Sequence, residues 1–231
     1  EYSYEVSSNS TLQFPQWTPL PSEGIASEKS TMEIEYPLDY TLRYKSFNYK
    51  NEPELTKGKS SNILTWKIEN LPAVWRESYA PLWHELTPMA IFGPDNFEID
   101  EYKGNMQSWQ EFGKFVYQLK QGKDALPDEL KKTVHTIADP VSDPKEKIRL
   151  LYEYMQHHTR YIGIQLGIGG FRPFDAKEVS TKGYGDCKAL SNFMYSLLKE
   201  VNIPSFYTLV YAGESKYYIT EDFPSQQFNH V

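Results

Sequence analysis

The hydrophobic pattern changes period near residue 105, and this change constrains the fold more than any other feature of the sequence. Upstream, apolar and polar residues alternate over 40–49, and β-branched and aromatic residues gather at 63–68. A period of two is typical of strands that bury one face. Pro and Gly turn signals separate these short runs. Residues 1–104 are therefore predicted to form a β-sandwich-like domain.

Downstream of this point, apolar residues recur in steps of three and four, which indicates amphipathic helices. We expect one helix at about 109–119 and a second after Pro127. A third is predicted to begin at Asp143, because Asp is a good N-cap and Pro144 suits the first helical position. Glu146 stands at the capping-box spacing from Asp143.

The rest of the chain combines a glycine-rich segment, a helix and two short strands. Residues 161–186 hold six glycines and are expected to be irregular. A fourth helix is predicted from about Asp186 to Val201, with strands at 206–211 and 217–220. Helices followed by a β region predict an α+β fold for residues 105–231.

Composition excludes several classes of protein. Lys and Arg total 24 against 31 for Asp and Glu, and without a basic cluster this balance argues against nucleic-acid binding. An aromatic content of 15% excludes a disordered acidic chain. No window approaches the roughly 18 consecutive apolar residues of a membrane-spanning helix, so no transmembrane segment is predicted.

The histidines do not predict a metal centre. His157 and His158 are adjacent on a predicted helix, so their side chains point about 100° apart, whereas helical ligand pairs need a spacing of three or four. His84 and His135 have no ligand-spaced neighbours. We expect neither a metal nor a cofactor.

The strongest local signal for chemistry surrounds Cys187, the only cysteine of the chain. Glycines precede Asp186, which can cap the fourth predicted helix, so Cys187 falls in the first helical turn. Free backbone N–H groups and the helix dipole stabilise a thiolate at this position. Cys187 is therefore a candidate nucleophile. The alternative is a buried structural cysteine.

A nucleophilic cysteine needs a base, and His230 follows 43 residues later on an apparent strand. A histidine on a strand that faces a cysteine at a helix N-terminus is the geometry of papain-like sites. The alternative is a strand-end histidine without a partner.

Several segments together resemble the bacterial transglutaminase-like core. They are RYIGIQ at 160–165, GGFRP at 169–173, GYGDCK at 183–188 and FNHV at 228–231. The N-terminal part is similar to the β-rich domain of unknown function that precedes this core in exported bacterial proteins. That similarity rests on IENLPA at 68–73, the run 94–97 and Ser108-Trp109.

The resemblance implies a Cys-His-Asp triad on a papain-like fold, with Cys187 as nucleophile and His230 as general base. In the family the third member, an Asp or Asn, lies on the strand after the histidine. That position would follow Val231, so we expect a core truncated at its C-terminus with an impaired site. Asp222 precedes His230 and does not fit the family order.

Two further residues are candidates for the oxyanion hole or the cleft. Gln165 lies in the loop before the nucleophile and is a side-chain donor candidate by analogy with papain-like enzymes. Tyr184 is a candidate for lining the cleft. The alternative for Gln165 is an ordinary loop residue bonded to backbone.

The sequence thus predicts thiol-dependent acyl transfer on an amide or peptide bond through a cysteine thioester. Transfer to water would make the protein a cysteine peptidase or amidase, and transfer to an amine a transglutaminase. The expected partner is a protein or peptide substrate, with cell-wall peptide as one candidate. The resemblance implies an exported, periplasmic or cell-surface location. The alternative function is a non-catalytic exported scaffold that binds peptide or carbohydrate.

Overall fold

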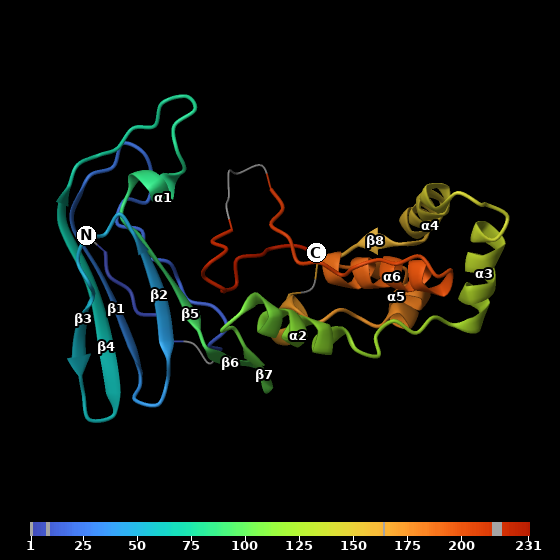
Figure 1. Ribbon diagram of the computed structural model, residues 1–231, viewed down its shortest axis with the longest axis horizontal. Coiled ribbons are helices and arrows are strands. Elements are labelled where there is room, and N and C mark those ends of the chain that lie inside the picture. Colours follow the sequence, from blue (N-terminus) through green and yellow to red (C-terminus); the bar gives the residue numbers. More distant parts are fainter. Residues whose placement is uncertain (1, 8–9, 164, 214–218) are drawn as a thin grey trace. The chain divides into compact units, whose positions relative to one another are not determined.

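A computed structural model describes the chain. The described residues are 2–7, 10–163, 165–213 and 219–231. They form two compact units (Figure 1). The first, here the β unit, comprises Glu1–Ile99, Lys103–Trp109 and Tyr218–Gln226. The second, here the helical unit, comprises Asp100–Tyr102, Gln110–Tyr217 and Gln227–Val231. The predicted domains 1–104 and 105–231 stay a prediction.

The β unit contains small antiparallel sheets. One has the strand order β1-β4-β3, with bounds β1 (Ser27–Pro37), β4 (Ser61–Leu71) and β3 (Glu54–Lys57). Two pairs complete the set: β2 (Leu42–Phe47) with β5 (Met89–Pro94), and β6 (Asn96–Ile99) with β7 (Tyr102–Asn105). A short helix, α1 (Trp83–Leu86), precedes β5.

Strand β5 is buried on both faces. Ala90 and Phe92 share one core with Trp66, which is fully buried and lies 4.9 Å from Phe92 between ring centroids. The alternate residues of β5, Met89 and Ile91, pack against Phe223 instead. Both faces of one strand therefore contribute to the apolar interior of this unit.

The helical unit is built around α6. Its elements are α2 (Trp109–Lys120), α3 (Asp128–Ala138), α4 (Pro144–His158), α5 (Ala176–Lys182), α6 (Cys187–Glu200), the 3-10 helix Gly167–Gly170 and the parallel pair β8 (Arg160–Tyr161) with β9 (Tyr184–Gly185). Phe193 and Leu197 of α6 are almost fully buried against residues of α3, α4 and α5, such as Val134, Leu151 and Val179.

The predicted helices at 109–119, after Pro127, from Asp143 and from Asp186 correspond to α2, α3, α4 and α6. Asp143 caps α4 by accepting a hydrogen bond from the Lys145 N–H at 3.2 Å. Glu146 forms an ion pair with Arg149 at 2.5 Å. The coarse α+β prediction is confirmed as small antiparallel sheets followed by helices.

Two local predictions are wrong. The segment 161–186 is not irregular throughout, because it contains α5. This helix ends at Lys182, and its C-cap Gly183 has the left-handed conformation with φ +67°. Residues 206–211 form no continuous strand among the described residues, since Val210 makes only an isolated bridge with His230. A strand needs a continuous ladder with a partner. Of the predicted strand 217–220, Tyr217 and Tyr218 lie outside the described residues.

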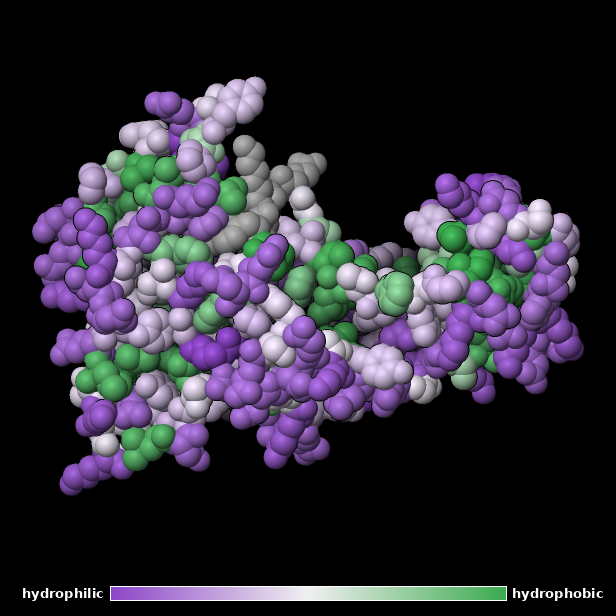
Figure 2. All heavy atoms as spheres, viewed as in Figure 1, coloured by the Kyte–Doolittle hydropathy of each residue, from purple (hydrophilic) through white to green (hydrophobic). Residues whose placement is uncertain are grey.

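The surface of the helical unit is strongly polar over α3. Figure 2 shows hydrophilic side chains covering the outer side of this helix. Within α3, Lys131 pairs with Asp128 and Lys132 pairs with Glu129. Across the residues the structure describes, no helix is both long and apolar enough to span a bilayer.

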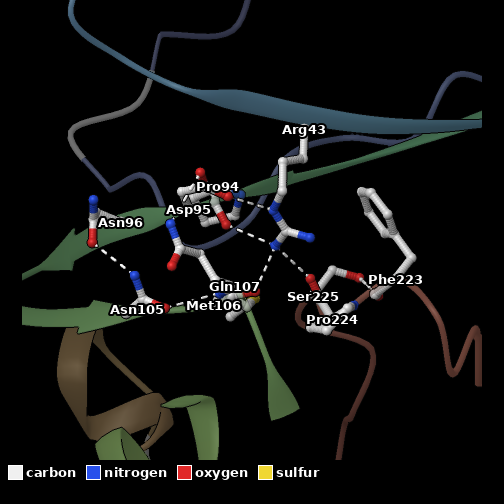
Figure 3. A network of polar contacts seen from close by, with 10 residues as sticks. All are labelled: Arg43, Pro94, Asp95, Asn96, Asn105, Met106, Gln107, Phe223, Pro224 and Ser225. Atoms are coloured by element: carbon white, nitrogen blue, oxygen red, sulfur yellow. Dashed lines mark hydrogen bonds and ion pairs between the residues drawn. The ribbon is translucent and has the colours of Figure 1, made fainter. Parts of the chain in front are cut away.

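Arg43 on β2 holds a polar centre inside the β unit (Figure 3). Its Nη2 donates to the carbonyl oxygens of Pro94 at 2.8 Å, Met106 at 2.7 Å and Pro224 at 2.7 Å. Its Nε lies 2.8 Å from Asp95 Oδ1. One guanidinium thus joins the end of β5, the end of β7 and the segment 219–226.

Arg43→Met is expected to destabilise the β unit by about 2–4 kcal/mol, because three carbonyl groups and a carboxylate lose their charged donor. All five tryptophans lie within residues 1–109, so tryptophan fluorescence in a urea titration follows this unit.

Lys45→Met is the matched control. Lys45 lies on the same strand and binds Asp222 in the same segment, but Asp222 is 75% exposed. An exposed pair contributes at most about 1 kcal/mol. If the two variants lost the same free energy of unfolding, the result would contradict a central role for Arg43.

Candidate active site

Cys187 is the first residue of α6 and is only 7% exposed. Asp186 is the N-cap of this helix, and its Oδ1 accepts a hydrogen bond from the Ala189 N–H at 3.0 Å. Its Oδ2 accepts from Lys188 Nζ. The cap fixes where the helix begins, so it also fixes the position of the cysteine among the free N–H groups of the first turn.

A close backbone approach holds the chain just before the cysteine. The carbonyl of Gly185 on β9 accepts from the Ile162 N–H at 3.0 Å. A Cβ at Gly185 would lie 2.7 Å from the Cβ of Ala189, which is closer than van der Waals contact allows. Only glycine fits between β8 and the first turn of α6.

His230 is placed by backbone pairing with the segment after α6. Its N–H donates to the Val210 carbonyl at 3.0 Å, and its own carbonyl accepts from the Val210 N–H at 2.9 Å. The Asn229 side chain reinforces this pairing through two hydrogen bonds to the backbone of Ala212, at 2.8 and 2.9 Å. The backbone that carries the imidazole is therefore held at His230 itself and at the preceding Asn229.

Cys187 and His230 line the same cavity of about 360 Å³. Its walls also include Tyr161 from β8, Ser191 from α6 and Phe206 from the segment after α6. Segments far apart in sequence therefore bring the two predicted catalytic residues to one opening. Their catalytic roles stay a prediction.

Two tyrosines that sequence reasoning missed lie beside the cysteine. Burial raises the pKa of Tyr161, and the neighbouring Cys187 adds to this effect. Burial also raises the pKa of Tyr207, with further contributions from Cys187 and Asp186. The Tyr207 hydroxyl is buried without a hydrogen-bond partner among the described residues. Apolar or aromatic residues stand at the alternate positions 201, 203, 207 and 209, and this period-two signal could have pointed to Tyr207 as inward-facing.

The other predicted site residues lie elsewhere. Gln165 is exposed and Tyr184 is half-buried on β9, and neither lines the cavity. Their predicted roles stay predictions. Asp222 forms an ion pair with Lys45 at 2.5 Å within the β unit.

Comparison with solved structures finds a fold similar to part of a putative protease. A putative protease from Parabacteroides distasonis has a similar structure, with a TM-score of 0.58, 16% sequence identity and 88% of this chain covered. A putative cysteine protease from Cytophaga hutchinsonii matches at a TM-score of 0.32 and 13% identity over 77% of this chain. This chain spans 38% and 60% of those two chains. No family model and no curated protein matches it.

Gly185→Ala is expected to destabilise the helical unit by about 1–3 kcal/mol, because the added methyl group overpacks the start of α6. Thermal unfolding followed by circular dichroism at a helix-sensitive wavelength measures this effect, since most helices belong to this unit.

Gly113→Ala is the control. Gly113 lies on the exposed side of α2, and a methyl group added there would have no atom within 4 Å. Alanine at this position is expected to stabilise the helix by about 1 kcal/mol. A neutral effect of Gly185→Ala would argue against a tight contact before the cysteine.

Proposed function

We propose that the protein carries out thiol-dependent acyl transfer on an amide or peptide bond, with Cys187 as nucleophile and His230 as general base. The observation that carries the proposal is the shared cavity, which both residues line. The position of Cys187 at the start of α6 supports it, because N–H groups and the helix dipole favour a thiolate there.

The proposed reaction proceeds through a thioester intermediate. His230 would first take the proton of the Cys187 thiol. The thiolate would then attack the carbonyl carbon, and the C–N bond would break as His230 gives that proton to the leaving amine. The backbone N–H of Cys187 is the candidate donor to the oxyanion. Water or an amine would then attack the thioester and release the thiol. The orienting Asp or Asn that the resemblance implies is assigned to no residue of this chain.

The protease-like fold supports a peptide as the substrate class. The finer assignments, a papain-like core of the transglutaminase-like superfamily and an exported location, belong to the same proposal. The cavity rim favours water as the acceptor, because Phe206 is 90% exposed and Tyr161 is 56% exposed. An open rim admits water to the acyl-enzyme.

A non-catalytic scaffold is the second candidate, and the low exposure of Cys187 favours it. A cysteine used only for packing reacts slowly and does not respond to a neighbouring histidine. The two candidates therefore differ in how the thiol reacts.

The rate of Cys187 alkylation by iodoacetamide, measured from about pH 4 to 10, tests the enzyme proposal. We expect a midpoint roughly one unit below the value of about 8.5 for a free cysteine, because thiolate and imidazolium stabilise each other. With one cysteine in the chain, mass spectrometry reports this site alone.

His230→Ala is expected to raise the midpoint. His157→Ala is the matched control, since His157 is exposed on α4 and does not line the cavity, and it should leave the profile unchanged. If the alkylation profile of His230→Ala is the same as that of the wild type, the result would favour the scaffold.

Turnover of p-nitrophenyl acetate tests the acyl-enzyme directly. We expect a burst of p-nitrophenol with acetylation of Cys187, followed by release of acetate to water. Cys187→Ser should abolish the burst. Added methylamine is expected to change the steady rate little, and a strong acceleration would assign the protein to amine transfer instead.

A further inference from the structure

The cysteine lies between two oppositely charged residues that are both buried. Asp186 and Lys188 form an ion pair in which the side chains are 5% and 4% exposed. Lys188 is the second residue of α6, where the positive end of the helix dipole disfavours a cation. A buried lysine at this position therefore needs a reason beyond helix formation.

The carboxylate of Asp186 is required for the cap, because its Oδ1 accepts from the Ala189 N–H at 3.0 Å. The same carboxylate is a negative charge one residue away from the nucleophile. A buried like charge opposes ionisation of its neighbour. A cap made by aspartate thus conflicts with a thiolate at the next residue, unless another group balances the charge.

We propose that Lys188 is a positioning residue that neutralises Asp186, so that the cap can be kept while Cys187 ionises. The inference rests on the proposed function, in which Cys187 is the nucleophile. Lys188 Nζ donates to Asp186 Oδ2, the oxygen that the Ala189 N–H leaves open. Both oxygens of the carboxylate then have a donor.

The other groups that face Cys187 do not supply this balance. Tyr161 on β8 and Tyr207 from the segment after α6 are its aromatic neighbours, and burial raises the pKa of each, so both stay uncharged at neutral pH. His230 reaches the cavity from the C-terminal segment, and the proposed function already assigns it to the thiolate. Within the described part of the chain, Lys188 is the cation that contacts the cap carboxylate.

A role in stability would not by itself explain the pair. Replacing a buried ion pair by uncharged residues of similar volume is often neutral for stability. The pair is instead explained if each charge has a task, with the carboxylate as the cap and the ammonium as its counter-charge.

Alkylation of Cys187 by iodoacetamide in the full chain tests the proposal. Lys188→Met is expected to raise the pH midpoint by about one unit, since the buried carboxylate is then uncompensated. Lys182→Met is the matched control. Lys182 pairs with Glu178 on α5 at 2.5 Å but is 49% exposed, so its loss should leave the midpoint unchanged.

The variant Asp186→Asn is expected to shift the pH midpoint of alkylation in the opposite direction. Asparagine still accepts from the Ala189 N–H, while Lys188 becomes an unpaired cation beside the thiol, so the midpoint should fall. The double variant Asp186→Asn/Lys188→Met should return close to the wild-type midpoint. A purely structural pair would instead move both single variants in the same direction, or lower their melting temperature with an unchanged midpoint, and either result overturns the proposal.

The outcome is separable from that of the proposed function. Dependence of the wild-type midpoint on His230 tests the catalytic pairing, whereas the opposite shifts of the two single variants test the charge balance. If Lys188→Met does not fold by circular dichroism, Asp186→Asn carries the test alone, and an unchanged or raised midpoint in that variant rejects the proposal.

Discussion

The Asp186 carboxylate fixes the start of α6, and the remainder of the helical unit is arranged around that helix. Its Oδ1 holds the Ala189 N–H, and Gly185 immediately before it packs so closely on Ala189 that no side chain fits. These two constraints leave little freedom in where the first turn lies. The buried face of α6 then organises the core, with Phe193 and Leu197 almost fully buried.

In each unit one cationic side chain donates hydrogen bonds to oxygen atoms: Arg43 in the β unit and Lys188 in the helical unit. The chemistry of each side chain suits its role. Arg43 joins three carbonyl oxygens and a carboxylate, which suits a planar guanidinium with five donors. Lys188 faces one carboxylate oxygen, which suits a compact point charge. The arginine connects segments distant in sequence, whereas the lysine acts within a single turn. Arg43 therefore helps to assemble the β unit, whereas Lys188 affects the charge balance at one position of the helical unit.

What the sequence predicts well is local. The α4 helix has its cap at Asp143 and its proline at the first position, and α6 has its cap at Asp186, so the start of each is encoded in neighbouring residues. The seven-residue α5 escapes prediction because glycines surround it and its apolar period is too short to detect. Residues 206–211 carry strand-like residues, but a ladder depends on a partner, and the bridge that forms joins Val210 to His230 alone.

In the candidate site, too, local sequence predicts some features, whereas others depend on the tertiary fold. Cys187 is predictable because its helix cap lies beside it, whereas Tyr161 and Tyr207 become its neighbours only through the tertiary fold. Analogy predicts Gln165 as a donor in the cleft, and this role stays a prediction; Gln165 is exposed. Short-range signals locate a candidate nucleophile, but the groups that surround it come from elements whose packing no local pattern encodes.

The likeness to the solved structure of a putative protease at 16% identity concerns the fold alone, and one fold can host several chemistries. Under the proposed function, a hydrolase and a transferase would differ in which acceptor reaches the acyl-enzyme. Here the aromatic residues at the cavity, Phe206 and Tyr161, are themselves exposed. An amine can compete with bulk water only where a rim excludes the solvent or binds the amine first. Under the proposed function, the exposed rim therefore supports water rather than an amine as the acyl acceptor.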